Sequence, residues 1–228
     1  MRKLRLKMLK IKKKMPFYKS NSFIRDLKKN GVTIGENVVF YKPSTTSVDL
    51  NSSNFIKIGN NVQITDGVVI LGHDYAYSVV TNKYNKILRP QSETIIGDNV
   101  FIGINSIILM GTKIGNNTII GAGSVVKGKI DSDSVYAGNP AKKICTLEEY
   151  KEKLQSKYLE SARCYYRNMK NSVNENNMNI YRELWTEKRI MSEYIKKASP
   201  RGMTKSSIEK IDFERKYKNF DEFVKDTE

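Results

Sequence analysis

The 228-residue sequence contains one histidine, two cysteines and one tryptophan. A single histidine, His73, excludes the zinc sites that are built from two or three imidazoles, so we expect no metal ion. Cys145 and Cys164 are too few for a disulfide framework, and their spacing matches neither a metal site nor a redox motif. No stretch approaches the roughly 20 continuous apolar residues that a transmembrane helix requires. We therefore expect chemistry that depends on neither a metal nor a thiol.

The N-terminal sequence lacks the continuous apolar core and the small-residue cleavage site of a secretory signal, which predicts a cytoplasmic protein. Acidic residues are also scarce there: residues 1–30 carry 12 basic groups and 1 acidic group, whereas residues 31–144 carry 10 and 8, and residues 145–228 carry 18 and 15. The formal net charge of +16 therefore arises mainly at the N-terminus. Because no recognition motif accompanies this charge, we expect no nucleic-acid partner.

Residues 1–15 carry apolar side chains at helical spacing. Leu4, Met8, Ile11 and Met15 would share one side of a helix whose other sides are lysine and arginine. This pattern suits an anionic membrane surface and predicts peripheral contact at the inner face of the membrane. A solvated basic arm is the alternative.

An apolar residue recurs at every sixth position through the middle of the chain, which neither a helical period nor the two-residue period of a strand explains. The series includes Ile96, Ile102, Ile108, Ile114, Ile120 and Val126, and the same six-residue spacing occurs upstream among Ile58, Ile64 and Ile70 and between Ile34 and Phe40. The 24 residues from Ile34 to Ile58 equal four repeats. Such a period predicts a solenoid of short stacked units.

The other positions of each repeat are restricted as well. The fourth position is asparagine or glycine, which tolerate a left-handed backbone at a corner: Asn37, Asn61, Gly67, Asn99, Asn105, Gly111, Asn117 and Gly123. The fifth position is small or β-branched: Val38, Val62, Val68, Val100, Ser106, Thr112, Thr118 and Ser124. Each repeat is therefore predicted to be a short strand plus a turn, and three repeats form one coil of a triangular prism.

These residues resemble the repeats of the hexapeptide-repeat acyltransferases, and more narrowly those of the sugar O-acetyltransferases of surface-polysaccharide biosynthesis. The resemblance covers about residues 31–157. It implies a mainly β fold, a left-handed parallel β-helix, and a homotrimer. We predict a basic N-terminal segment over residues 1–30, a β-helix domain over residues 31–144 with a loop at 76–95, and a helical extension over residues 145–228.

A capping box, Thr146-Leu-Glu-Glu149, predicts where the helical extension begins. Apolar residues then follow at helical spacing: Leu147, Tyr150, Leu154, Tyr158 and Tyr165. A second helix is predicted over about residues 178–197, ahead of the helix-breaking stretch Ser199-Pro-Arg-Gly202.

His73 occupies the fourth position of the repeat that begins at Ile70, which is a corner that faces outward. The repeat is then interrupted from Tyr75 to Ile96, and an excursion of that length in a solenoid is typical of a functional loop. The stretch Gly72-His-Asp-Tyr75 resembles the histidine motif of the family, which implies that His73 is the catalytic general base. An idle surface histidine is the alternative.

A neutral imidazole can take the proton of an acceptor hydroxyl as the oxygen attacks a thioester carbonyl. A carboxylate or a backbone carbonyl should hold the second ring nitrogen. Asp74 is adjacent to His73, but neighbours in an extended chain point apart. We therefore assign Asp74, with Tyr75 and Arg89, to acceptor binding. We expect no covalent acyl-enzyme, because neither cysteine lies in a nucleophile motif.

The later repeats resemble the coenzyme A groove of the family, which implies acetyl-CoA as the acyl donor. The implied cofactor-binding residues are Phe101, Gly103, Ile104, Gly121, Ala122, Lys127, Asn139, Pro140 and Lys142. Lys142, with Lys127 or Lys129, would supply positive charge for the phosphates. The family often shows a lysine that is followed by an acid, an aliphatic residue and a proline. The corresponding stretch here, Lys127-Gly-Lys-Ile-Asp131, lacks the proline. Which lysine contacts phosphate therefore stays open.

The leading hypothesis is an acetyl-CoA-dependent O-acetyltransferase that modifies a sugar hydroxyl of a surface polysaccharide or its precursor. An acetyltransferase for a small molecule, such as an antibiotic or an amino sugar, shares the same residues and is one alternative. A non-catalytic β-helix scaffold is the other. A carbonic anhydrase of the same fold would need three histidines.

Overall fold

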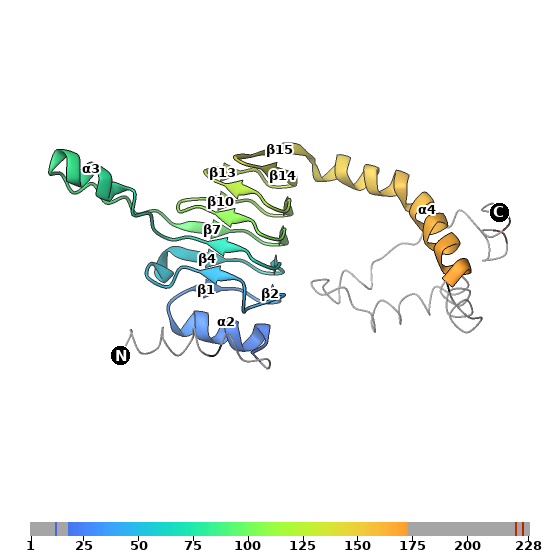
Figure 1. Cartoon of the computed structure of the whole chain (residues 1–228), viewed down its shortest axis with the longest axis horizontal. Coiled ribbons are helices and arrows are strands. Elements are labelled where there is room, and N and C mark those ends of the chain that lie inside the picture. The colour runs from blue at the N-terminus through green and yellow to red at the C-terminus, as the bar shows by residue number, and fades with distance from the viewer. Residues whose placement is uncertain (1–11, 13–17, 173–221, 223–224, 226–228) are drawn as a thin grey trace. The chain divides into compact units, whose positions relative to one another are not determined.

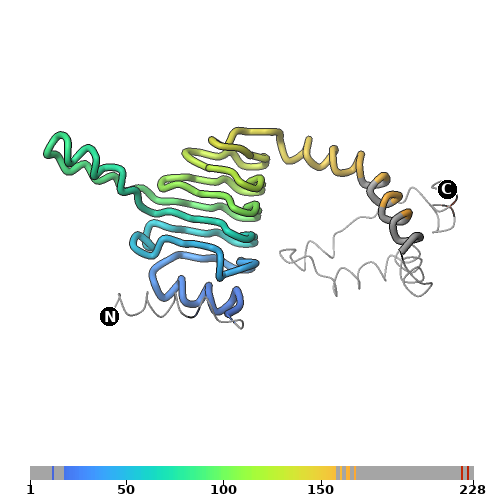
Figure 2. Tube along the Cα trace, in the orientation of Figure 1, coloured from blue at the N-terminus to red at the C-terminus, as the bar shows by residue number. Residues whose placement is uncertain are grey.

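The computed structural model describes residues 12, 18–172, 222 and 225, and the chain divides into two units, Met1–Tyr150 and Lys151–Glu228. In the first unit, short strands stack in successive coils, which Figure 1 shows as a ribbon and Figure 2 as a continuous trace. Each of the first four coils contributes one strand to each of three sheets, and the fifth coil contributes to two. This arrangement is a parallel β-helix.

The three sheets run along the stack. The first sheet holds β1 (Thr33–Ile34), β4 (Ile56–Ile58), β7 (Thr94–Ile96), β10 (Lys113–Ile114) and β13 (Lys129–Ile130). The second holds β2 (Val39–Phe40), β5 (Gln63–Ile64), β8 (Val100–Ile102), β11 (Thr118–Ile120), β14 (Ser134–Gly138) and β15 (Ala141–Thr146). The third holds β3 (Ser47–Val48), β6 (Val69–Ile70), β9 (Ile107–Ile108) and β12 (Val125–Val126). All neighbours are parallel except β14 and β15, which form an antiparallel hairpin.

The length of a coil varies where residues are added between its strands. Ile96 pairs with Ile114, which lies three repeats further on, whereas Ile34 pairs directly with Ile58. The interval from Ile34 to Ile58 is therefore a single coil and does not hold the four repeats that we predicted. Its six additional residues lie in the turn before β3 and around the 3-10 helix η1 (Ser53–Phe55).

The ladder residues predicted from the six-residue period form the core. Each is at most 6% exposed: Ile34, Phe40, Ile58, Ile64, Ile70, Ile96, Ile102, Ile108, Ile114, Ile120 and Val126. The small residues at the fifth position are buried as well, and their hydroxyls bond to the backbone. Ser106 Oγ donates to the carbonyl of Gly121 at 3.0 Å, and Thr112 Oγ1 donates to that of Leu109 at 2.7 Å. These bonds remove the cost of burying an unpaired hydroxyl.

The corners also follow the prediction. All eight asparagines and glycines predicted at the fourth position have positive φ, from 52° at Asn117 to 80° at Gly111. Asparagine side chains on successive coils bond to one another: Asn99 Nδ2 donates to Asn117 Oδ1 at 2.8 Å, and Asn117 Nδ2 donates to Asp133 Oδ1 at 2.9 Å. The corner residues thus stabilise both the turn and the stacking of coils.

Helix α2 (Ser20–Lys29) covers the end of the stack below β1 and β2 (Figure 1). Phe23 and Leu27, one turn apart, are 1% and 0% exposed, and the ring of Phe23 meets that of Phe40 edge to face at 4.9 Å between centroids. The helix therefore covers ladder residues that have no coil beneath them. Of residues 1–15, for which we predict membrane contact, Lys12 alone lies within the described residues.

The interruption of the repeat is an excursion that contains helix α3 (Tyr77–Tyr84), within the predicted loop 76–95. Figure 1 shows α3 projecting away from the coils, and none of its residues is buried. The chain returns to the stack at β7, where Glu93 Oε1 lies 2.6 Å from the ammonium nitrogen of Lys57 on β4.

Helix α4 (Leu147–Ser172) follows β15. The predicted capping box is present: the backbone N–H of Thr146 donates to Glu149 Oε2 at 2.7 Å, and the backbone N–H of Glu149 donates to Thr146 Oγ1 at 3.1 Å. The helix predicted over residues 178–197 lies outside the described residues.

Candidate active site

His73 lies just after β6, at the corner where the chain leaves the third sheet for the α3 excursion. Its side chain is 19% exposed. Unlike the asparagines and glycines at the other fourth positions, His73 does not have positive φ. The side chain is therefore largely covered but still reaches the outside of the prism.

Asp49 holds the ring of His73 in place. Asp49 directly follows β3 in the coil below, and its side chain is 4% exposed. Its Oδ2 atom bonds to Nδ1 of His73 and accepts the backbone N–H of Gly72 at 3.2 Å, while Oδ1 accepts the backbone N–H of Asn51 at 2.9 Å. Three donors thus share the two oxygens of one buried carboxylate.

This contact determines which nitrogen of His73 is available for chemistry. A carboxylate only accepts hydrogen bonds, so Nδ1 carries the proton and Nε2 keeps its lone pair. The free lone pair can accept a proton from a bound hydroxyl. The charge of Asp49 also stabilises the imidazolium that such a transfer forms.

Sequence reasoning required a group at the second ring nitrogen but did not identify Asp49. Val69 pairs with Ser47 and Ile70 with Val48, so Asp49 lies below Leu71, two residues before His73. The residues added between Phe40 and Val48 move Asp49 out of the six-residue phase. A signal was still available, because an acidic residue directly after a buried strand residue takes the place that Leu71, Leu109 and Lys127 occupy in the other coils of the third sheet.

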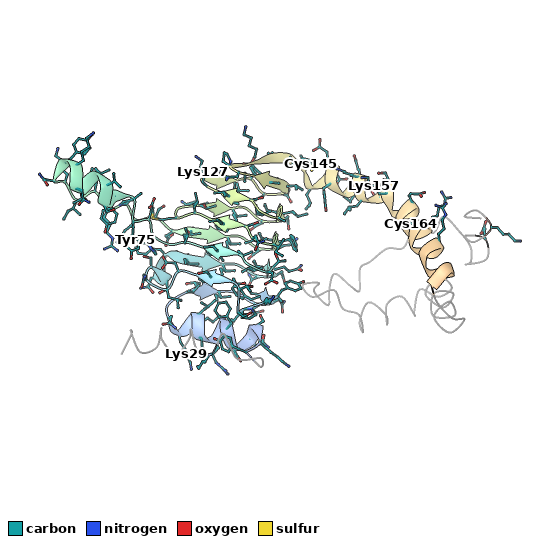
Figure 3. The ribbon with its side chains drawn as sticks, in the orientation of Figure 1. Lys29, Tyr75, Lys127, Cys145, Lys157 and Cys164 are labelled. Carbon is teal, nitrogen blue, oxygen red and sulfur yellow. The ribbon has the colours of Figure 1, made fainter. Side chains whose placement is uncertain are left out.

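The three residues assigned to acceptor binding lie along the excursion. The ring of Tyr75 meets the imidazole of His73 edge to face at 4.3 Å between centroids, and Figure 3 shows Tyr75 where the excursion leaves the coils. Asp74 Oδ1 accepts the backbone N–H of Ala76 at 2.7 Å, which fixes the turn before α3. Arg89 is exposed on the segment that returns to β7. Tyr75 is thus the one of the three in direct contact with His73.

The first five residues assigned to cofactor binding, from Phe101 to Ala122, lie at another corner. Phe101 on β8 and Ile104 beyond it are 36% and 46% exposed, and Ala122 is exposed one coil above. These residues lie at or near the corner between the second and third sheets, whereas His73 lies between the third and first. The outer face of the third sheet therefore separates them from His73 within one chain.

The glycines among these residues have a structural role of their own. A Cβ atom at Gly103 would lie 2.5 Å from the backbone nitrogen of Ala122, and one at Gly121 would lie 2.8 Å from Cβ of Ala137. Stacking of the next coil thus requires glycine at both positions. At the neighbouring Gly123 a Cβ atom would meet nothing within 4 Å, so that corner faces open space.

The remaining cofactor candidates lie toward the end of the stack opposite α2. Lys127 is exposed at the corner after β12, and Figure 3 places it near that end. Asn139 and Pro140, joined by a cis peptide bond, form the turn between β14 and β15, and Lys142 is exposed on β15. No ion pair with a described residue involves Lys127 or Lys142, whereas Lys143 pairs with Asp131 at 3.5 Å.

In the part of the chain that the structure describes, no group of three or more histidine, cysteine, aspartate or glutamate side chains is arranged to hold a metal ion. None of the helices described there combines the length and the apolar character needed to cross a membrane.

Comparison with known proteins identifies the repeat. Residues 93–128 match the family described as bacterial transferase hexapeptide (six repeats). Protein CapG of Staphylococcus aureus is 36% identical over 128 residues, which cover 56% of this chain and 73% of CapG. The fold class is thus the predicted left-handed parallel β-helix of hexapeptide repeats.

Two other relatives are matched over a smaller share of their length. The putative lipopolysaccharide biosynthesis O-acetyl transferase WbbJ of Escherichia coli K12 is 32% identical over 47% of this chain and 60% of WbbJ. The putative acetyltransferase YvoF of Bacillus subtilis 168 is 35% identical over 44% of this chain and 53% of YvoF. Among solved structures, a maltose O-acetyltransferase from Clostridium difficile 630 is 26% identical with a TM-score of 0.44, over 64% of this chain and 85% of that one.

Proposed function

Because the chain belongs to the hexapeptide-repeat acyltransferases, we propose that it transfers the acetyl group of acetyl-CoA to a sugar hydroxyl of a surface polysaccharide or its precursor, with His73 as the general base. The observation that carries this proposal is the pairing of His73 with the buried carboxylate of Asp49. A histidine oriented in this way is preorganised to take a proton at Nε2.

In the proposed reaction, Nε2 of His73 removes the proton of the acceptor hydroxyl while the oxygen bonds to the thioester carbonyl carbon. As the carbon–sulfur bond breaks, the imidazolium returns the proton to the departing sulfur. Asp49 stabilises the imidazolium between these two steps. One proton enters and leaves His73 in each turnover, so the enzyme is regenerated without a covalent acyl-enzyme.

The residues of the later coils fit the donor. The exposed apolar side chains of Phe101 and Ile104, beside the open corner at Gly123, suit the pantetheine arm. Lys127 and Lys142 lack acidic partners among the described residues and would face the phosphates. These features support acetyl-CoA as the donor.

The assignment of the acceptor rests on a relative. WbbJ is described as a putative lipopolysaccharide biosynthesis O-acetyl transferase, which supports a glycan hydroxyl as the acceptor. Tyr75, which lies against the imidazole of His73, offers an exposed aromatic surface on which a sugar ring can pack. Asp74, just before Tyr75, and Arg89, further along the same excursion, would bind the hydroxyls of the sugar.

The proposal includes a homotrimer. Within one chain, the third sheet separates the corner of His73 from that of Ile104 and Ala122. A site that uses both corners can form when the His73 corner of one copy faces the Ile104 corner of the next, and a ring of three copies would close this contact. A cytoplasmic location, with membrane contact through residues 1–15, belongs to the same proposal.

The direct test is acetyl transfer by the purified chain and by His73→Ala, with thiol release from acetyl-CoA measured over a panel of saccharides. The variant should fold normally, because the ring lies outside the apolar ladder. Its kcat should fall by roughly 10²- to 10⁴-fold, the usual contribution of a positioned general base. Binding of acetyl-CoA should be retained. Near-normal turnover by His73→Ala on a verified acceptor would overturn the assignment of the base.

A further inference from the structure

The end of the β-helix that α2 covers carries a basic face. Arg25, Lys28 and Lys29 are exposed on α2. The two lysines lie three and four residues after Arg25, so the three side chains share one side of the helix. Phe23 and Leu27 are buried on the opposite side of the same helix, against the first coil. Figure 3 shows Lys29 at this end of the stack. The reaction proposed above uses none of these three cations.

One acidic residue of α2, Asp26, lies close enough to this face to interact electrostatically with Lys29. Its side chain is 13% exposed, and it already binds the hydroxyl of Tyr18 and the ammonium group of Lys12. No ion pair with another described residue involves Arg25, Lys28 or Lys29. Residues 1–17 add eight basic residues and no acidic one to the same end of the sequence.

The candidate site is asymmetric along the axis of the stack. His73 lies in the second coil, and every candidate cofactor residue lies in the third to fifth coils. The first coil and α2 therefore lie on the side of His73 that the donor does not occupy. Strands stack about 4.8 Å apart and a helix packs about 10 Å from a neighbouring layer, so the outer face of α2 lies roughly 20 Å from His73.

We propose that the outer face of α2 docks on an anionic lipid bilayer, so that the end of the β-helix opposite the candidate cofactor residues faces the membrane. Cations that share one side of a helix match a plane of negative charge, and each one near such a surface strengthens binding by roughly fivefold. On this arrangement, acetyl-CoA approaches from the end of the stack opposite α2, and the acceptor is presented at the lipid surface. This statement about the donor and the acceptor rests on the proposed function.

The test measures binding of the full chain to vesicles of phosphatidylcholine with or without phosphatidylglycerol. The variant R25Q/K28Q/K29Q removes three charges from the α2 face, and K113Q/K153Q/K157Q removes three exposed charges elsewhere. The α2 variant should bind anionic vesicles roughly 100-fold more weakly, whereas the matched control should bind within a few-fold of the wild-type chain. Wild-type binding should weaken with added salt, because surface electrostatics are screened.

A second measurement tests the orientation of the chain on the bilayer. In a C145S/C164S background, a polarity-sensitive dye is attached at Lys29→Cys or at Lys113→Cys on β10. Anionic vesicles should shift the emission to the blue at position 29 and leave position 113 unchanged.

Equal loss of binding by the two triple variants would overturn the proposal in favour of a diffuse charge effect. An α2 variant that keeps vesicle binding but loses binding to a duplex oligonucleotide would overturn it in favour of nucleic acid. Neither binding assay needs turnover, so a failure of acetyl transfer and a failure of docking are separate results.

Discussion

Three donors now bind the carboxylate of Asp49: Nδ1 of His73 and the backbone N–H groups of Gly72 and Asn51. Replacing Asp49 by asparagine would keep the size of the side chain but leave a single oxygen for these three donors. The amide NH₂ group must then face either Asn51 or His73. If it faces His73, it donates to Nδ1 and moves the ring proton to Nε2, where the base needs a lone pair. We expect kcat to fall at least roughly tenfold, with the KM for acetyl-CoA unchanged.

The single histidine makes this prediction directly observable. The ¹⁵N resonances of His73 should report a proton on Nδ1 in the wild-type chain and a different tautomer ratio in Asp49→Asn. Asp49→Glu, which restores a carboxylate, should recover part of the turnover. Should Asp49→Asn change the melting temperature but neither kcat nor the tautomer, Asp49 would have a structural role alone.

At the level of elements, the corners of the coils can be tested at Asn117. Its backbone has a φ of 52°, and its side chain bonds to Asn99 below and Asp133 above. Asn117→Ala loses both bonds and places a Cβ-bearing residue that lacks a local polar contact in the left-handed region. We expect a loss of about 2 kcal/mol in the free energy of unfolding. Asn117→Gly also loses the two hydrogen bonds, but glycine adopts the left-handed backbone without strain. Denaturant titration should therefore show a loss that is smaller than that of Asn117→Ala by about 1 kcal/mol.

Helix α2 provides a pH-dependent contribution to stability. Burial alone would raise the pKa of Asp26, but the hydroxyl of Tyr18 and the ammonium groups of Lys12 and Lys29 stabilise the carboxylate and hold the pKa below the ordinary value of 3.8. Because the folded-state pKa lies below the unfolded-state value, this stabilisation is complete above about pH 4 and is lost as the pH falls through the folded-state value. The difference in melting temperature between the wild-type chain and Asp26→Asn should therefore be largest near neutrality and shrink below about pH 4. A difference that is constant from pH 7 to pH 3 would contradict this account.

For the whole molecule, the proposed use of both corners by one site would make assembly a condition for activity. Sedimentation at micromolar concentration should show a trimer, and dilution that releases monomers should reduce specific activity in parallel. A monomer with full specific activity would show that both sets of residues can serve one site within a single chain. That result would contradict the assignment of Ile104 and Ala122 to the donor groove, while leaving His73 and Asp49 in place.

The six-residue period alone determined the ladder, the buried small residues and the left-handed corners. Each coil repeats the same local geometry, so the place of Ile108, Ser106 or Asn105 follows from its number within the repeat. The outward corner position of His73 followed in the same way. The sequence also indicated the helix that begins at Leu147, because a capping box is a contact between residues three apart.

Tertiary structure alone decided the partner of His73 and the cover provided by α2. Asp49 reaches His73 because residues added to the first coil shift its register against the second, and such a shift depends on how the insertions fold. Phe23 and Leu27 enter the core because the ladder of the first coil would otherwise be open to water. Both contacts join residues that do not hold equivalent positions in the six-residue repeat. Periodicity specifies only how equivalent residues of successive coils stack, so it could not predict either contact.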